Sequence, residues 1–256
     1  MKGEAHKFIT EKVLKYFAEE FQFSENEIYW IARGSIAEDS ILLPARYFKW
    51  HFYRSNSFIK KHIGLGVNPT SETRFKTLVT KLKWPWGDEN KAEMLGNIIH
   101  HIQDMSTPTH VVPIYHGPDL KSPKLKILDP YEEYMMDNIE EMDFLSTIDQ
   151  SITPRDWFDI YDSTAKLSLE YLANEKVPMK NEYLTMKFSQ IWTPYPLTKK
   201  GKYKGFGEFG KHFDCFNTNK KATHIDIDAI YKHFTTQAAQ TTYEALKCYV
   251  KKFKNR

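Results

Sequence analysis

Residues 96–110 decide the fold, and they read Gly-Asn-Ile-Ile-His-His-Ile-Gln-Asp-Met-Ser-Thr-Pro-Thr-His. We expect a helix up to Asp104, in which His100 and Asp104 are one turn apart and share one face. Pro108 is a helix breaker, so it should turn the chain back and bring His110 to the same end. Two imidazoles and a carboxylate that converge in this way form a ligand set for a transition metal. The same residues also fit a helix that merely carries histidines, with Asp104 in solvent.

The composition is that of a folded globular protein, with 15% aromatic and 27% charged residues in a sequence of 256. A net charge of +3 provides no electrostatic argument for binding nucleic acid or an anionic membrane. No apolar run approaches the roughly 20 residues of a transmembrane helix, and the first residues lack the apolar core of a secretory signal. Cys215 and Cys248 are too few for a disulfide framework, so the cellular compartment stays open. The oligomeric state is open as well.

Apolar residues at helical spacing recur along the sequence and predict an all-α fold. Ser24 followed by Glu27 is typical of a capping box at the start of a helix. No alternating strand pattern persists, so we expect a single-domain helical bundle over residues 1–256. The expected helices cover residues 6–21, 25–37, 72–82 and 89–104, a segment beginning at Asp129-Pro130, a segment after Pro154, and residues 225–253.

Side chains that bind divalent metals occur at four places in the sequence. Taken singly, each has an ordinary structural explanation, such as an exposed histidine, a turn or helix cap, or a core histidine among aromatics. Taken together they predict a zinc cluster, because inward-facing histidines and carboxylates from different helices build such sites in bundles. The four places are His6, then Asp39 with His51, then His100, Asp104 and His110, and finally Asp129 with Glu133.

The order of these groups resembles the family of zinc-dependent phospholipases C and S1/P1-type nucleases. The similarity is carried by Ala5-His6, by Gly-Ser-Ile-Ala-Glu-Asp at residues 34–39, by His51-Phe52-Tyr53, and by the His-x-x-x-Asp-x-x-x-Pro-x-His pattern of residues 100–110. It continues weakly through Trp157 and Ala165 to the last helix, and so covers nearly the whole chain. The resemblance implies an all-helical fold of the phospholipase C/P1 nuclease type with three zinc ions, and hydrolysis of a phosphodiester by a metal-activated hydroxide.

The resemblance also implies a role for each ligand. Asp39, His51, His100 and Asp104 would hold the first zinc ion, with Asp104 bridging and Asp39 doubling as a general base. His110 and Glu133 would hold a second ion, together with Asp129 where the family has a histidine, or with His116 in its place. His6, Asp104 and the amino terminus would hold a third ion, with Met1 at the position of the family's tryptophan.

The resemblance leaves the substrate class open. We favour a phospholipase C acting on phospholipids, because His51-Phe52-Tyr53 is similar to the bacterial phospholipases. Phe48 matches an aromatic residue of their choline pocket and Glu4 is a candidate acid for it, although Phe48 also fits core packing. Phe52 fits both branches, since the nucleases stack a base on an aromatic residue at this place.

Two alternative functions remain. One is a phosphodiesterase acting on single-stranded nucleic acid, as in the S1/P1 branch. The other is a non-catalytic, metal-stabilised helical binding protein, which Asp129 and the missing tryptophan favour. The basic, glycine-rich segment at residues 199–210 is either a solvated loop or a transient contact with a membrane surface or a polyanion.

Overall fold

The structure is a computed structural model, and it is predominantly helical in the part of the chain that it describes. That part comprises residues 3–39, 51, 53, 71–111, 135–173, 176–178, 183–185, 192–193, 208–209 and 227–254. The prediction of an all-α fold is confirmed. The α-helices are α1 (Gly3–Tyr16), α2 (Ala18–Phe21), α3 (Glu25–Ala37), α6 (Ser71–Leu82), α7 (Asp88–Asp104), α8 (Pro108–Val111), α10 (Trp157–Ala173) and α11 (Ile227–Tyr249).

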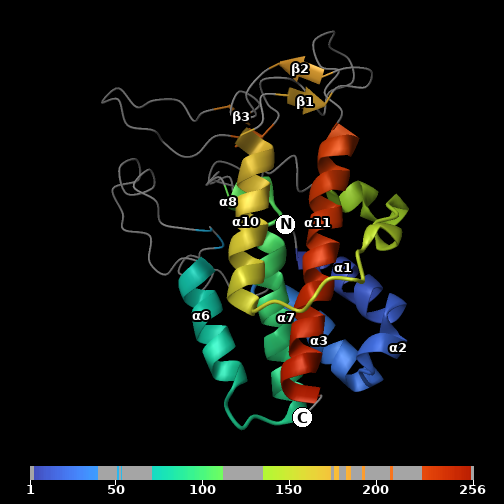
Figure 1. Ribbon diagram of the computed structural model, residues 1–256, viewed down its shortest axis with the longest axis vertical. Helices are drawn as coiled ribbons and strands as arrows, with labels where there is room; N and C mark the ends of the chain where they lie inside the picture. The colour runs from blue at the N-terminus through green and yellow to red at the C-terminus, as the bar shows by residue number, and fades with distance from the viewer. Residues whose placement is uncertain are drawn as a thin grey trace, which may run out of the picture.

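Helix α7 is the centre of the bundle. It contacts α1, α3, α6, α10 and α11, and the long helices run alongside one another in Figure 1. Four of its apolar side chains, those of Leu95, Ile98, Ile99 and Ile102, are fully buried. Burial of each such side chain stabilises the fold by about 1.5–3 kcal/mol, so α7 holds the surrounding helices together. None of the described helices combines the length and apolar character that crossing a bilayer requires.

The short remaining elements do not change the fold class. Strand β1 (Lys176–Pro178) pairs antiparallel with β2 (Tyr183–Thr185), and β3 (Trp192–Thr193) pairs antiparallel with β4 (Glu208–Phe209). Figure 1 shows β1 and β2 at one end of the bundle, beyond the last turn of α10. Two 3-10 turns, η1 (Ile139–Glu141) and η2 (Leu145–Thr147), precede α10, and α11 continues into a π-helical turn, η4 (Val250–Lys254).

Helices α3 and α7 approach each other closely at two glycines. A Cβ atom added to Gly34 would lie 2.0 Å from the carbonyl oxygen of Glu93. A Cβ atom added to Gly96 would lie 2.1 Å from the carbonyl oxygen of Ile31. Both distances are far below van der Waals contact, so this pair of helices requires glycine at both positions.

The first predicted helix is interrupted at one residue. Phe17 separates α1 from α2, with φ −106° and ψ 27°. Helical hydrogen bonds continue across the break, from the amide of Phe17 to Val13 and from the amide of Phe21 to Phe17. The rings of Phe17 and Phe21 both pack against Tyr243 of α11, with centroids 4.7 and 5.5 Å away. We attribute the departure from helical geometry to this tertiary packing, which apolar spacing along one helix does not encode.

The predicted capping box is present at the start of α3. The Ser24 hydroxyl accepts a hydrogen bond from the Glu27 amide at 3.2 Å, and Glu27 accepts one from the Ser24 amide at 2.8 Å. Lys254 near the end of η4 donates to the same Glu27 carboxylate at 3.0 Å. The cap therefore fixes the start of α3 and also connects it to the last helix.

Replacement of Ser24 by alanine should lower the free energy of unfolding by about 1 kcal/mol, because the Glu27 amide in the first turn of α3 loses its side-chain acceptor. Urea denaturation followed by circular dichroism measures this change. Ser24→Asp, which retains a side-chain acceptor, should unfold close to the wild type. Equal losses in the two variants would contradict a capping role.

Candidate metal centre

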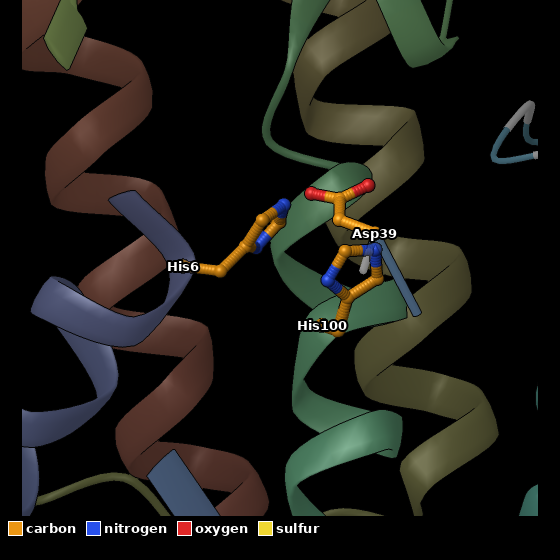
Figure 2. A group of neighbouring side chains, drawn as sticks. All are labelled: His6, Asp39 and His100. Carbon is orange, nitrogen blue, oxygen red and sulfur yellow. The ribbon is translucent and has the colours of Figure 1, made fainter. Parts of the chain in front are cut away.

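Those predicted ligands that the structure describes meet where the first turns of α1 reach the carboxyl-terminal ends of α3 and α7. Figure 2 shows His6, Asp39 and His100 arising from three different segments and lying around a common space. One ligand atom from each of these side chains lies within 4.8 Å of the others. The carboxyl-terminal ends of helices carry partial negative charge, which favours a cation at this place.

Asp104 lies at the centre of the cluster and contacts four imidazoles. Its Oδ2 atom is 2.7 Å from Nδ1 of His51 and 3.4 Å from Nε2 of His100. Its Oδ1 atom is 3.2 Å from both Nε2 of His6 and Nδ1 of His110. Each carboxylate oxygen therefore faces its own pair of histidines, which is the arrangement required of a carboxylate that bridges two metal ions.

The spacing of these atoms suits ligands of a divalent ion. Nitrogen and oxygen ligands of tetrahedral zinc lie about 2.0–2.1 Å from the ion, which separates them from one another by about 3.3 Å. Three of the four contacts of Asp104 measure 3.2–3.4 Å. His51 Nδ1 and His100 Nε2 are 3.0 Å apart. The shorter separation of 2.7 Å between Asp104 and His51 is that of a direct hydrogen bond.

Hydrogen bonds outside the cluster orient two of the histidines. His100 donates from Nδ1 to the carbonyl oxygen of Ser35 at 2.8 Å, and this carbonyl belongs to the last turn of α3, where helical partners are lacking. His6 donates from Nδ1 to the side-chain oxygen of Gln103 at 2.7 Å. Both rings therefore present Nε2 to Asp104, as metal-binding histidines with a second hydrogen-bond partner do.

Two further observations show that the residues fit a metal. The Nε2 atoms of His6 and His51 are buried, and neither makes a hydrogen bond to any residue that the structure describes. Buried polar atoms normally have partners, and these two nitrogens could take a metal ion as theirs. Imidazole and carboxylate groups are ligands that zinc accepts.

The charges of the cluster are strongly coupled. Burial raises the pKa of Asp104, but the neighbouring His110 and His100 outweigh burial and hold this pKa well below its usual value. Burial lowers the pKa of His100, but the carboxylates of Asp104 and Asp39 outweigh it and raise this pKa to about 9. Burial, assisted by His100, lowers the pKa of His6 to about 4. The metal-free centre thus combines an ionised Asp104, a protonated His100 and a neutral His6 at pH 7.

Asp39 lies at the rim of the cluster, with a side chain that is 13% exposed. Its Oδ1 atom is 3.9 Å from Nε2 of His51. Burial raises the pKa of Asp39, but His100 and His51 outweigh it, and the net direction is downward. The side chain is therefore an ionised carboxylate at neutral pH, in reach of both the buried ligands and solvent.

Tyr53, two residues after His51, contacts the rest of the centre. The Tyr53 amide donates to the carbonyl oxygen of His110 at 3.1 Å. The Tyr53 hydroxyl donates to Asp162 of α10, and the Tyr161 hydroxyl donates to the Tyr53 carbonyl at 3.4 Å. These contacts link the His-x-Tyr motif to α8 and α10, and they place His51 beside Asp104.

Sequence reasoning missed a second buried group next to the centre. Glu38 is 1% exposed and accepts hydrogen bonds from Arg74, the shortest of 2.6 Å. Nε2 of His101 lies 3.6 Å from Glu38, and the His101 ring stacks on His51 with centroids 5.8 Å apart. His101 directly follows a predicted ligand, but neighbouring positions on a helix point about 100° apart, so helical spacing gives no indication that both residues reach one site.

The remaining predicted site residues have different outcomes. Glu4 is exposed on the first turn of α1, and its role in substrate binding stays a prediction. The other members of the predicted site lie outside the described residues; these are Met1, Phe48, Phe52, Asp129 and Glu133, together with His116 as the alternative to Asp129.

Comparison of the chain with protein-family models, with curated proteins and with solved structures finds no match.

Proposed function

We propose that this protein is a zinc-dependent phosphodiester hydrolase, with a fold of the phospholipase C/P1 nuclease type. The observation that supports this most strongly is the environment of Asp104, whose two oxygens face four imidazoles from α1, α7, α8 and the residue His51. A carboxylate shared in this way suits a cluster of ions better than a single ion, and clustered divalent ions are typical of phosphoester hydrolysis.

The proposed chemistry divides between the ions and the protein. When bound, divalent ions would lower the pKa of a water molecule and neutralise the charge of a phosphodiester. The hydrogen bonds of His6 to Gln103 and of His100 to Ser35 orient the Nε2 atom of each ring toward Asp104. Asp104 connects the histidine pair at its Oδ1 atom with the pair at its Oδ2 atom. Asp39, ionised and partly exposed, is placed to accept a proton from water, although its lowered pKa makes it a weak base.

Within this class we propose a phospholipid as the substrate. The support is the resemblance of His51-Phe52-Tyr53 to the bacterial phospholipases, together with the link that Tyr53 makes between this motif and His110. The small net charge of +3 provides no comparable support for a polyanionic nucleic acid. A transient contact with a membrane surface is part of the proposal, because the substrate resides there.

The test uses the purified chain of 256 residues in two steps. Elemental analysis should find several zinc ions per chain, and removal of metal by a chelator should abolish hydrolysis until zinc is restored. The chain is then assayed on phosphatidylcholine, on a soluble phosphodiester analogue and on single-stranded DNA. Hydrolysis of the lipid alone supports the proposed substrate, whereas hydrolysis of DNA alone would move the protein to the nuclease branch. Bound zinc without turnover of any substrate would favour a metal-stabilised binding protein.

A further inference from the structure

Gln103 is a fully buried polar residue that joins three helices in the interior of the bundle. It belongs to α7, directly before Asp104. Its side-chain oxygen accepts the hydrogen bond from Nδ1 of His6 in α1. Its side-chain nitrogen donates to the hydroxyl of Thr10 in α1 at 3.1 Å and to the hydroxyl of Thr242 in α11 at 2.8 Å. The amide thus uses its oxygen and both hydrogens.

The hydrogen bonds of Thr242 determine which way the Gln103 amide faces. The Thr242 hydroxyl donates its single hydrogen to the carbonyl oxygen of Ala238 at 2.7 Å. It can therefore only accept from Gln103, so the nitrogen of Gln103 must face α11 and its oxygen must face His6. An oxygen opposite Nδ1 requires a hydrogen on that nitrogen. Each donor and acceptor is therefore fixed in the series of hydrogen bonds that runs from His6 through Gln103 and Thr242 to the Ala238 carbonyl.

We propose that Gln103 is a positioning residue, which holds His6 as the Nδ1-protonated tautomer and aims its Nε2 lone pair beside Asp104 to receive a divalent cation. A neutral histidine in water prefers the opposite tautomer, with the hydrogen on Nε2, and that form has no lone pair to offer there. Gln103 reverses this preference. Because Gln103 bonds to Thr242, α11 helps to orient a ligand of one cation position. No residue of α11 is itself among the ligand contacts described above. The inference rests on the proposed metal centre.

Two variants and a matched control test this role. Gln103→Leu removes the acceptor, and Thr242→Val removes the partner that orients the amide while it preserves side-chain shape. Thr241→Val makes the same change at the neighbouring position, where the hydroxyl bonds, among the described residues, to the carbonyls of Gln237 and Ala238. Long-range ¹H–¹⁵N NMR of the metal-free chains reports the His6 tautomer, and zinc titration reports the number and affinity of bound ions.

We expect the wild type and Thr241→Val to hold His6 with hydrogen on Nδ1, and Gln103→Leu to lose this state. Loss of such an outer partner should weaken zinc binding at one position about 10–100-fold, with a smaller loss in Thr242→Val. Gln103→Glu keeps an acceptor for His6 but loses the donor to Thr242, so hydrogen should remain on Nδ1 of His6 in this variant. Comparison with Gln103→Leu then separates hydrogen bonding to His6 from simple filling of space.

The proposal is overturned if hydrogen resides on Nε2 of His6 in the wild type, or if Gln103→Leu leaves the tautomer unchanged. Should Gln103→Leu fail to fold, Thr242→Val decides, since an unchanged tautomer and unchanged zinc affinity in that variant would also overturn it. The tautomer is measured without metal or substrate. A chain that hydrolyses no phosphodiester can therefore still support the positioning role, and the two proposals fail separately.

Discussion

Replacement of Asp104 by asparagine should strip zinc from the protein and abolish hydrolysis. The variant preserves the shape of the side chain but replaces one oxygen by an NH₂ group, which cannot bind a cation, and it removes the negative charge. Asp104 contacts His6 through Oδ1 and His100 through Oδ2, so in the proposed metal centre a single change should affect more than one cation position. The loss of zinc affinity should exceed the roughly 10–100-fold that removal of an outer hydrogen-bond partner causes.

Elemental analysis and a phosphodiesterase assay on the same preparation measure this result. Asp159→Asn is the matched control, because Asp159 is exposed on α10 and the change in charge is identical. We expect the control to retain zinc and activity. A folded Asp104→Asn protein that keeps both would show that this carboxylate is not the bridge.

Replacement of Gly96 by alanine should destabilise the protein strongly, although alanine is the better helix former by about 1 kcal/mol in an exposed helix. The new methyl group would lie 2.1 Å from the carbonyl oxygen of Ile31 and 2.7 Å from Cα of Gly34. Both atoms belong to the backbone, so α3 and α7 must separate. Overpacking of this kind typically costs about 1–3 kcal/mol and occasionally more. We expect a loss of at least about 2 kcal/mol in the free energy of unfolding.

Gly87→Ala provides the control, because an added Cβ atom at Gly87 has no neighbour within 4 Å. Denaturant unfolding should show a loss below about 1 kcal/mol for this cap position. Separation of the helices should also pull Ser35 from His100, so Gly96→Ala should bind zinc more weakly. If Gly96→Ala is as stable as Gly87→Ala, the close approach of α3 and α7 does not exist.

The helical elements could be predicted from the sequence because their signals are local. The predicted helix at residues 25–37 matches α3, and the predicted helix at residues 89–104 begins one residue after α7 does. Apolar spacing and the Ser24 capping box are read within a few neighbouring residues. The break at Phe17 escaped this reasoning because its cause, the ring of Tyr243, is remote in the sequence.

The candidate site was predictable only in part, for a related reason. His100 and Asp104 follow from helical spacing, whereas His6, Asp39 and His51 were associated with them through the order of motifs in a resembling family. The roles of Gln103 and Ser35 depend on which atoms face which across helix interfaces. A buried glutamine or a helix-end carbonyl has no signal in the sequence that would reveal such a partner.

The hydrogen bonds of Gln103 have a consequence for the order of assembly. Thr10 and Thr242 belong to the first and last helices of the described fold, and both must be in place before the amide that orients His6 is fixed. While the chain emerges from the ribosome, α11 is the last of these helices to be made. A nascent polypeptide should therefore gain full affinity for its cations only after α11 has docked. Tight cation binding would then occur late in folding and only in correctly folded chains.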